Sequence, residues 1–201
     1  MCTHIHISSV NNNLYWGRTL DTSFNPFDVD SKVTIVPRNF TLKTQSKPWK
    51  TKYAFLGINL CGSTLFFDGV NEKGLAGGLL FLKACTWDKK ENIEKQGLIA
   101  INSGEIVTWI LSNFESVSDI KNNISKVVVT SDDIPSLGEL GKGNPITAHY
   151  TFTDKMGESV VLEPTNHGHF RVFDNTVGVM ANDPTFDWHM TNLANYLQVQ
   201  G

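Results

Sequence analysis

Short apolar segments separated by Asn, Asp, Gly or Pro fill most of the first third of this chain. Runs of about four to eight residues that are rich in Val, Ile, Thr and aromatic side chains and end at turn formers are typical of β-strands. The predicted strands are Thr3–Ser8, Tyr15–Leu20, Lys32–Val36, Tyr53–Ile58 and Thr64–Phe67. The chain therefore has to bury the faces of a sheet.

A hairpin is predicted directly after these segments. Val70–Gly74 has turn chemistry and lies between two apolar runs. Leu75–Leu82 is then the returning strand, and its glycines predict a place where another part of the molecule approaches the backbone closely.

Helical periodicity takes over after this hairpin. The apolar residues at helical spacing are Ile106, Val107, Ile110, Leu111 and Phe114. Ser103 is the predicted N-cap of this helix. A second helix is predicted to begin at Ser116, with Asp119 in its first turn, where a carboxylate is favourable.

Strands are predicted again in the last third, over His149–Thr153, Ser159–Glu163 and His169–Phe173. Strands followed by helices and then by strands indicate an α+β fold in which helices cover sheet faces. A four-layer αββα sandwich is compatible with this order, although the pattern alone does not select it. Residues 1–201 contain no internal repeat or linker and are expected to form one domain.

Composition and charge exclude several classes of protein. The net charge is −3 and the 17 Lys and Arg residues are scattered, so the basic surface of a nucleic-acid-binding protein is not expected. No apolar stretch reaches the length of a bilayer span, and the N-terminus lacks a secretory signal, which indicates a cytoplasmic protein. Cys2, Cys61 and Cys85 have no metal-ligand spacing and are expected to be free thiols, without a disulfide framework or a zinc site.

Cys2 follows the initiator methionine directly. Removal of Met1 is expected before so small a residue, and it would leave a thiol and a free α-amine on Cys2. The α-amine has a reference pKa of about 8 and the thiol about 8.5, so the amine can take the proton of the thiol near neutral pH. Position alone also fits an ordinary buried cysteine.

Arg18 and Asp21 belong to the segment Gly17–Asp21, at the end of a strand that can pair with the strand after Cys2. A guanidinium beside the thiol would stabilise the thiolate, and a carboxylate beside the α-amine would orient it. As an isolated pair these two residues equally fit a surface ion pair.

Five blocks of sequence together resemble the choloylglycine hydrolase family, which comprises bile salt hydrolases and penicillin V acylases within the N-terminal-nucleophile hydrolase superfamily. The blocks are Met1–Thr3, Gly17–Asp21, Val36–Phe40, Asp68–Leu75 and Asn182–Trp188. They occur in the family's order, and the resemblance covers essentially the whole chain. It implies a four-layer αββα sandwich and hydrolysis of linear amide bonds without a metal or an organic cofactor.

The resemblance implies roles for individual residues. Cys2 matches the nucleophile that forms a thioester, Arg18 the arginine beside the thiolate, and Asp21 the carboxylate that holds the N-terminal amine. Asn182 matches an asparagine whose side-chain amide donates to the oxyanion. The backbone N–H of Phe81 falls where a second oxyanion donor is expected.

The same resemblance bears on the substrate, a small-molecule acyl amide such as a conjugated bile salt or penicillin V. The resemblance aligns Phe81 with a position that is asparagine in bile salt hydrolases and tyrosine in penicillin V acylases. An aromatic residue there favours an acylase. Phe24, Phe27 and Trp87 are further candidates for an apolar acyl pocket.

Two alternatives stay open. Cys2, His4 and His6 alternate along one predicted strand and can share a face, which would suit a Cys–His dyad or a metal site, although the family chemistry needs no histidine.

The second alternative concerns length. The chain stops at Gly201, whereas the family continues with a segment that supplies another active-site arginine. The fold is therefore expected to be incomplete at this end. The alternative function is a catalytically inactive remnant that at most binds acyl amides. Full-length relatives are commonly oligomeric, so a homo-oligomer is a possible assembly.

Overall fold

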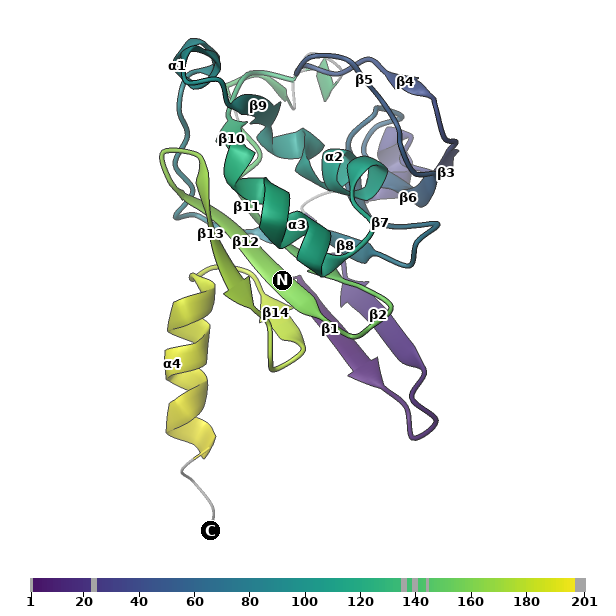
Figure 1. The fold of residues 1–201 in the computed structure, drawn as a ribbon, viewed down its shortest axis with the longest axis vertical. Coiled ribbons are helices and arrows are strands. Elements are labelled where there is room, and N and C mark those ends of the chain that lie inside the picture. Colours follow the sequence, from purple (N-terminus) through teal and green to yellow (C-terminus); the bar gives the residue numbers. More distant parts are fainter. Residues whose placement is uncertain (1, 23–24, 135–136, 139–140, 144, 198–201) are drawn as a thin grey trace.

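A nine-stranded sheet forms the centre of the computed structural model, which describes residues 2–22, 25–134, 137–138, 141–143 and 145–197 (Figure 1). In spatial order its strands are β3 (Val33–Val36), β6 (Phe55–Asn59), β7 (Phe66–Asn71), β8 (Ala76–Phe81), β11 (Ala148–Thr153), β12 (Ser159–Asn166), β13 (His169–Asp174), β10 (Val127–Thr130) and β9 (Ile99–Asn102). Neighbouring strands are antiparallel, except for the parallel pair β9 and β10.

A three-stranded antiparallel sheet carries the N-terminal strand at its centre. Its order is β14 (Val179–Ala181), β1 (Thr3–Ser8) and β2 (Leu14–Thr19). Thr3 lies opposite Thr19 on one side and Ala181 on the other. Because antiparallel partners move in opposite directions along the chain, this register brings Cys2 next to Asn182. A short ribbon of β4 (Thr41–Leu42) and β5 (Trp49–Lys50) completes the strands.

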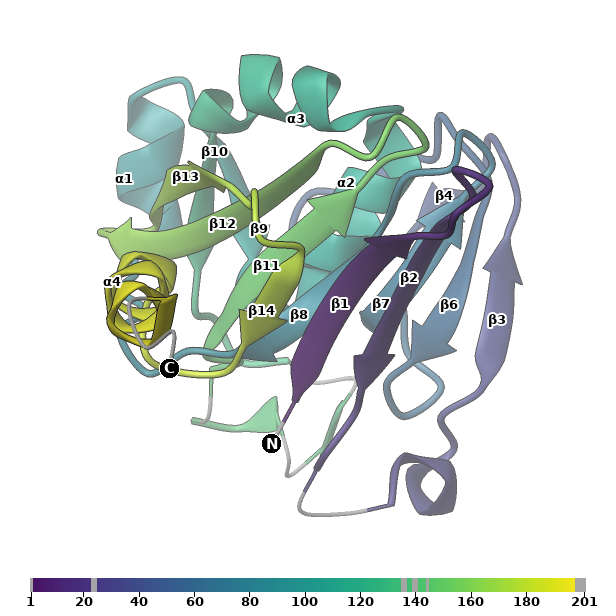
Figure 2. The ribbon, with the colours of Figure 1, turned by 90° about the horizontal axis from the view of Figure 1, so that it is seen from below.

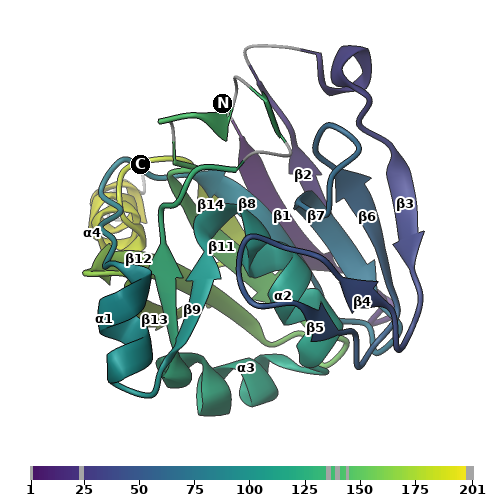
Figure 3. The same cartoon turned by 90° about the horizontal axis from the view of Figure 1, so that it is seen from above.

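The two sheets and the helices are stacked in layers. Helices α2 (Ile106–Asn113) and α3 (Val117–Asn123) cover one face of the nine-stranded sheet, and the three-stranded sheet lies on the other face (Figures 2 and 3). Helix α4 (Phe186–Leu197) lies beside β13, where the rings of Phe186 and Phe173 are 5.7 Å apart. The expected α+β class, with helices on a sheet face, is confirmed.

Shorter helical segments connect these layers. They are α1 (Lys90–Lys95) and the 3-10 turns η1 (Pro26–Val29), η2 (Ser103–Glu105) and η3 (Ile124–Lys126). None of the helices in the described part of the chain combines the length and the hydrophobicity that crossing a bilayer requires.

Three glycines lie in register across β6, β7 and β8, and the middle one lets helix α2 approach the sheet. Gly57 faces Gly69, and Gly69 faces Gly77. A Cβ atom added to Gly69 would lie 2.9 Å from Cδ1 of Leu111 in α2, and one added to Gly77 would lie 2.2 Å from Cδ1 of Phe152. The close backbone approach predicted for the glycines of β8 is therefore confirmed.

Two local predictions were wrong in extent. The strand predicted over Thr64–Phe67 begins and ends later, as β7, because the buried side chain of Asn71 donates to Leu111 O at 2.9 Å and Phe114 O at 2.7 Å and holds the strand against α2. The tight turn is confined to the residues that follow Asn71. The first helical segment starts with η2, whose cap is Asn102, since the Asn102 side chain accepts the N–H of Gly104 at 3.0 Å.

Candidate active site

Cys2 lies buried at the start of β1, with its thiol against the backbone of Asp21. The Sγ atom accepts the N–H of Asp21 at 3.5 Å and lies 3.7 Å from the carbonyl oxygen of the same residue. A backbone N–H that points at sulfur stabilises a thiolate. The pairing of β1 with β2 supplies this contact, because it brings the end of the Gly17–Asp21 segment alongside Cys2.

Arg18 lines the same cavity as Cys2 from the neighbouring strand. Its side chain is 4% exposed, and Nη1 donates to Phe67 O at 3.4 Å and lies 3.7 Å from Oδ2 of Asp68. Burial raises the pKa of the Asp68 carboxyl, and the guanidinium of Arg18 opposes that rise. The pairing with Asp68 fixes this buried cation in the wall of the cavity that Cys2 also lines.

Asn182 is bound to the end of strand β8. Its side-chain Oδ1 accepts the N–H of Phe81 at 3.1 Å, and the N–H of Asp183 donates to Phe81 O at 2.7 Å. Since Oδ1 is used as an acceptor, the amide NH2 group is the part of Asn182 that can donate to a substrate. The N–H of Phe81 thus holds Asn182 in this structure, a different use from the oxyanion donor that the sequence predicts.

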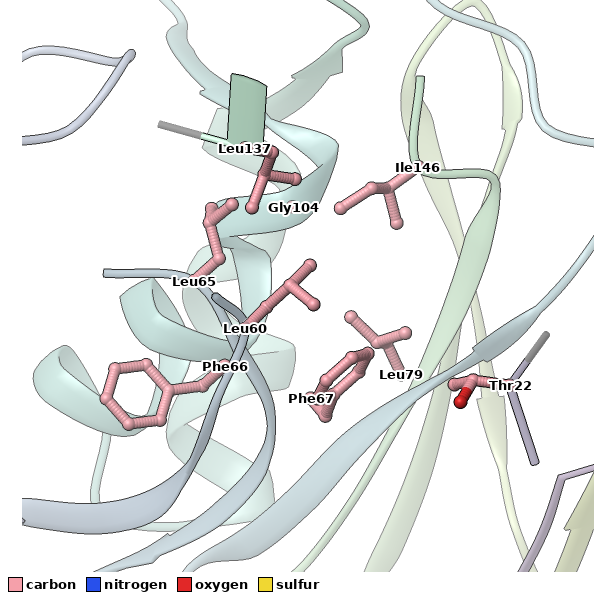
Figure 4. Close-up of a pocket in the computed structure, with 9 residues that line it drawn as sticks. All are labelled: Thr22, Leu60, Leu65, Phe66, Phe67, Leu79, Gly104, Leu137 and Ile146. Carbon is pink, nitrogen blue, oxygen red and sulfur yellow. The ribbon is translucent and has the colours of Figure 1, made fainter. Parts of the chain in front are cut away.

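An apolar cavity opens beside the thiol. Cys2 and Arg18 line this outer cavity. A second, inner cavity of about 210 Å³ adjoins it, and both are lined by Thr22, Phe67, Leu79 and Ile146. Figure 4 shows the inner cavity, whose lining is almost entirely hydrocarbon. The other residues that line it are Leu60, Leu65, Phe66, Gly104 and Leu137.

The remaining predicted pocket residues divide into two groups. Phe24 and the side chain of Phe27 lie outside the described residues, as does Met1. Trp87 packs against the core between the helices and the sheet, and it does not belong to the described lining of either cavity. Phe81 is half exposed at the mouth of the cavity that Cys2 lines.

His4 and His6 share the inner face of β1, as the alternation predicts. Their ring centroids are 5.9 Å apart, and His4 lies 5.4 Å from Trp16. Burial, followed by the charges of His6 and Arg18, lowers the pKa of His4 to about 3, which makes it a weak base near neutral pH. Within the described residues no three His, Cys, Asp or Glu side chains converge in a way that would hold a metal ion.

Sequence reasoning missed three buried residues around this site. Asp68 lies in a block that carries the family resemblance, so that block was the available signal. His149 and Glu163 form a buried contact of 3.2 Å directly behind the Asn182 segment. Their pairing depends on strand register, which the sequence pattern did not specify.

Comparisons with known proteins agree with this geometry. Residues 2–201 match the model of the linear amide C–N hydrolases, choloylglycine hydrolase family. A bile salt hydrolase/transferase from Clostridium perfringens is 32% identical over 98% of this chain, and a conjugated bile acid hydrolase from Lactobacillus gasseri is 34% identical over 98%. This chain spans 58% and 60% of those two proteins.

Solved structures show the same fold. A variant of the conjugated bile acid hydrolase from Clostridium perfringens superposes with a TM-score of 0.84 at 31% identity, over 100% of this chain and 59% of that one. Penicillin V acylase from Agrobacterium tumefaciens superposes with a TM-score of 0.77 at 20% identity, over 100% of this chain and 58% of the acylase. The architecture is thus that of the N-terminal-nucleophile hydrolases.

Proposed function

This chain belongs to the choloylglycine hydrolase family of linear amide C–N hydrolases, and on that basis we propose that it hydrolyses acyl amides through Cys2. The observation that carries the proposal is the arrangement around the thiol. Sγ accepts the N–H of Asp21 at 3.5 Å, Arg18 lines the same cavity, and the register of β1 and β14 brings Asn182 alongside. The segment that contains Arg18 and Asp21 contacts the thiol, and the segment after β14 provides the side-chain amide of Asn182.

The proposed reaction begins after removal of Met1. The α-amine of Cys2 takes the thiol proton, and the thiolate adds to the carbonyl carbon of the substrate amide. The side-chain NH2 of Asn182 donates to the resulting oxyanion. When the C–N bond breaks, the amine leaves with the proton held by the α-ammonium group, and a thioester remains on Cys2. Water then adds to the thioester, which releases the acid and restores the thiol.

We assign Asp21 and Arg18 supporting roles in this scheme. The Asp21 carboxylate orients the α-amine of Cys2, while its backbone N–H contacts Sγ. The Arg18 guanidinium, held by Asp68 at 3.7 Å, lines the cavity that Cys2 lines and can pair with the attacking thiolate. Both effects act on the nucleophile before the substrate binds.

The inner cavity supports an apolar acyl group of modest size. Its volume is about 210 Å³. An apolar cavity of about 150 Å³ is large enough to hold a benzene ring, whereas pockets for drug-sized ligands span about 300–1,000 Å³. A single aromatic ring, as in penicillin V, fits the inner cavity, while the adjoining cavity that Cys2 lines, of about 450 Å³, leaves room for the rest of the acyl group. The aromatic side chain of Phe81 at the mouth favours the same class.

A substrate panel tests this preference. We expect penicillin V to be hydrolysed faster than glycine- and taurine-conjugated bile acids by the same preparation. The measurement is release of the leaving amine from each substrate at equal concentration. Hydrolysis of the bile acid conjugates alone would overturn the assignment of the cavity while leaving the reaction type intact.

Mass spectrometry of the intact chain tests the reaction type. We expect a mass without Met1, and an added acyl group on Cys2 after incubation with penicillin V. The other two cysteines are internal controls, because burial raises the pKa of the Cys85 thiol to about 12 and also raises that of Cys61. Cys2→Ser should carry no acyl group on these two thiols.

The competing candidate is an inactive remnant, and the same experiment separates it. Retained Met1, or labelling spread evenly over Cys2, Cys61 and Cys85, would support the remnant. Binding of penicillin V without any covalent adduct would do the same.

We propose a cytoplasmic setting for this chemistry. All three cysteines are free thiols in the structure, which suits a reducing compartment. For assembly we propose a homo-oligomer, which sedimentation of the purified chain tests. The apolar side chains Ile5, Ile7, Tyr15 and Val179 are exposed on the outer face of the three-stranded sheet and support association.

A further inference from the structure

His149 on β11 and Glu163 on β12 lie side by side behind the active site. Nδ1 of the imidazole and Oε1 of the carboxyl group are 3.2 Å apart, and both side chains are 0% exposed. Neither takes part in the reaction proposed above. Polar groups buried this deeply need partners, so their remaining contacts indicate what they do.

The remaining contacts flank Asn182 on both sides. Nε2 of His149 lies 3.0 Å from the carbonyl oxygen of Ala181, the last residue of β14. Oε1 of Glu163 accepts the N–H of Phe186, the first residue of α4, at 2.7 Å. The pair thus holds both ends of the 182–185 connection.

The direction of these hydrogen bonds follows from the atoms involved. The carbonyl oxygen of Ala181 only accepts, so Nε2 of His149 donates to it. Oε1 of Glu163 already accepts the N–H of Phe186, and a proton lies between this oxygen and Nδ1 of His149. The imidazole is therefore fixed at both nitrogens, and its orientation is set by the strand register of β11 and β12.

Asn182 has little freedom once its flanks are held. Its Oδ1 accepts the N–H of Phe81 at 3.1 Å, and its carbonyl oxygen lies 2.8 Å from Nε2 of His189 in α4. If Ala181 or Phe186 moved, the amide group of Asn182 would move with the connection. Misplacement of a catalytic group by about 1 Å can cost about a hundredfold in rate.

We propose that His149 and Glu163 are positioning residues, which fix the 182–185 connection so that the Asn182 amide points at the carbonyl oxygen of the bound acyl amide. This inference rests on the proposed function, because it concerns the oxyanion donor of that reaction. The pair acts through Asn182 and does not touch the substrate.

Thr153 and Ser159 provide a matched control. They join the same two strands, β11 and β12, at the opposite end of the ladder, with their hydroxyl oxygens 3.0 Å apart and buried. Thr153→Val removes one buried cross-strand hydrogen bond of these strands, far from the 182–185 connection. A general loosening of the sheet would appear in both His149 and Thr153 variants.

The test compares two reactions of Cys2. Acylation by penicillin V builds negative charge on the carbonyl oxygen, whereas alkylation by iodoacetamide forms an S–C bond, expels iodide and builds no oxyanion. We expect His149→Leu to slow acylation by about tenfold to a hundredfold and to change alkylation by less than about twofold. His149→Gln, whose amide can donate to Ala181 O, should recover most of the loss. Thr153→Val should leave both rates unchanged.

Several outcomes would overturn the proposal. These are equal slowing of both reactions by His149→Leu, an equal effect of Thr153→Val on acylation, or no effect of His149→Leu at all. If the leucine variant does not fold, Glu163→Gln replaces it, because its side-chain oxygen can still accept the N–H of Phe186 while its uncharged amide alters the contact with His149; slower acylation with unchanged alkylation is then expected, and equal slowing of both would overturn the proposal.

A failure of the proposed function itself gives a different result. The unsubstituted protein would then be alkylated at Cys2 but never acylated. Hydrogen exchange at the Phe81 amide would decide the positioning role in that case, because this N–H reports the place of Asn182. We expect it to exchange at least about tenfold faster in His149→Leu than in Thr153→Val, and unchanged protection would reject the inference.

Discussion

Strand β11 presents two equally buried faces that differ in chemistry. Ala148, Tyr150 and Phe152 point into the core beneath helices α2 and α3, whereas the alternate positions His149 and Thr151 face the three-stranded sheet and the active site. The helix side is mostly hydrocarbon, and polar groups buried there, such as the Asn71 amide and the Tyr150 hydroxyl, are hydrogen-bonded. The active-site side contains buried ring and guanidinium nitrogens that have no hydrogen-bond partner among the described residues.

This contrast indicates that the two faces of the sheet have different roles, one in stability and the other in placing polar groups at the active site. Apolar burial on the helix side supplies most of the stability. Polar burial on the other side fixes charges and donors around Cys2, and each incompletely paired polar atom there lowers stability. The two faces should therefore respond differently to substitution and to pH.

The largest effect is expected on the helix side. Ile110 is fully buried against the sheet, and Ile110→Ala should lower the free energy of unfolding by about 3 kcal/mol, because it removes apolar contacts and leaves a cavity. Urea unfolding at neutral pH measures this loss. Alkylation of Cys2 by iodoacetamide without denaturant should stay unchanged.

If Ile110→Ala lowered the free energy of unfolding by less than about 1 kcal/mol, the helix side would not be the main source of stability, because losses that small are typical of exposed positions. Slower alkylation of Cys2 in the folded variant would contradict the comparison in another way, because the helix side would then also shape the site.

The second effect comes from His4 on the active-site side. Its pKa is about 3 in the folded protein, against about 6.5 in an unfolded chain. Between these values the unfolded chain binds the proton and the folded chain does not. Stability is therefore complete above the unfolded pKa and falls as the pH is lowered towards the folded pKa, by about 2 kcal/mol at pH 5.

Urea unfolding at pH 7 and pH 5 measures this dependence, and His4→Leu should lose about 2 kcal/mol less than the unsubstituted chain over that interval. Burial lowers the pKa of His6 as well, so part of the acid sensitivity should persist in the variant. Parallel pH curves for the two proteins would show that His4 is not buried as a neutral ring.

The smallest effect is expected at the start of α3. The Ser116 hydroxyl accepts the N–H of Asp119 at 3.1 Å, and Ser116→Ala should cost about 1 kcal/mol, typical of a lost N-cap. Thermal unfolding measures it. We expect no change in the pH dependence of stability, because this cap lies on the helix side, and a changed pH dependence would contradict the division between the faces.

Local signals in the sequence predicted much of this fold. A short apolar run bounded by turn formers predicted β1 over Thr3–Ser8 as observed, and the second helix was predicted to begin at Ser116, which caps α3. The parallel pair β9 and β10 was missed, because its second strand is an apolar run buried on both faces, without alternation. Helix α4 was also missed, although Phe186, Met190, Leu193 and Leu197 stand at helical spacing; of its residues only Phe186 is buried.

The sequence identified individual site residues but not the contacts between them. The family blocks identified Cys2, Arg18, Asp21 and Asn182, whose positions are described here. They could not predict that Oδ1 of Asn182 accepts the N–H of Phe81, or that His149 contacts Glu163. These contacts depend on how distant strands align, and register is a property of the assembled sheets.

The pairing of β1 with β14 has a consequence for biosynthesis. Thr3 pairs with Ala181, so the strand after Cys2 acquires its second neighbour only when the far end of the described chain has been made. A ribosome delivers Cys2 first and Asn182 much later, and contacts this distant in sequence close slowly. The emerging thiol is thus without its proposed oxyanion donor during translation, so under the proposed function a nascent chain should not consume acyl amides before it has folded.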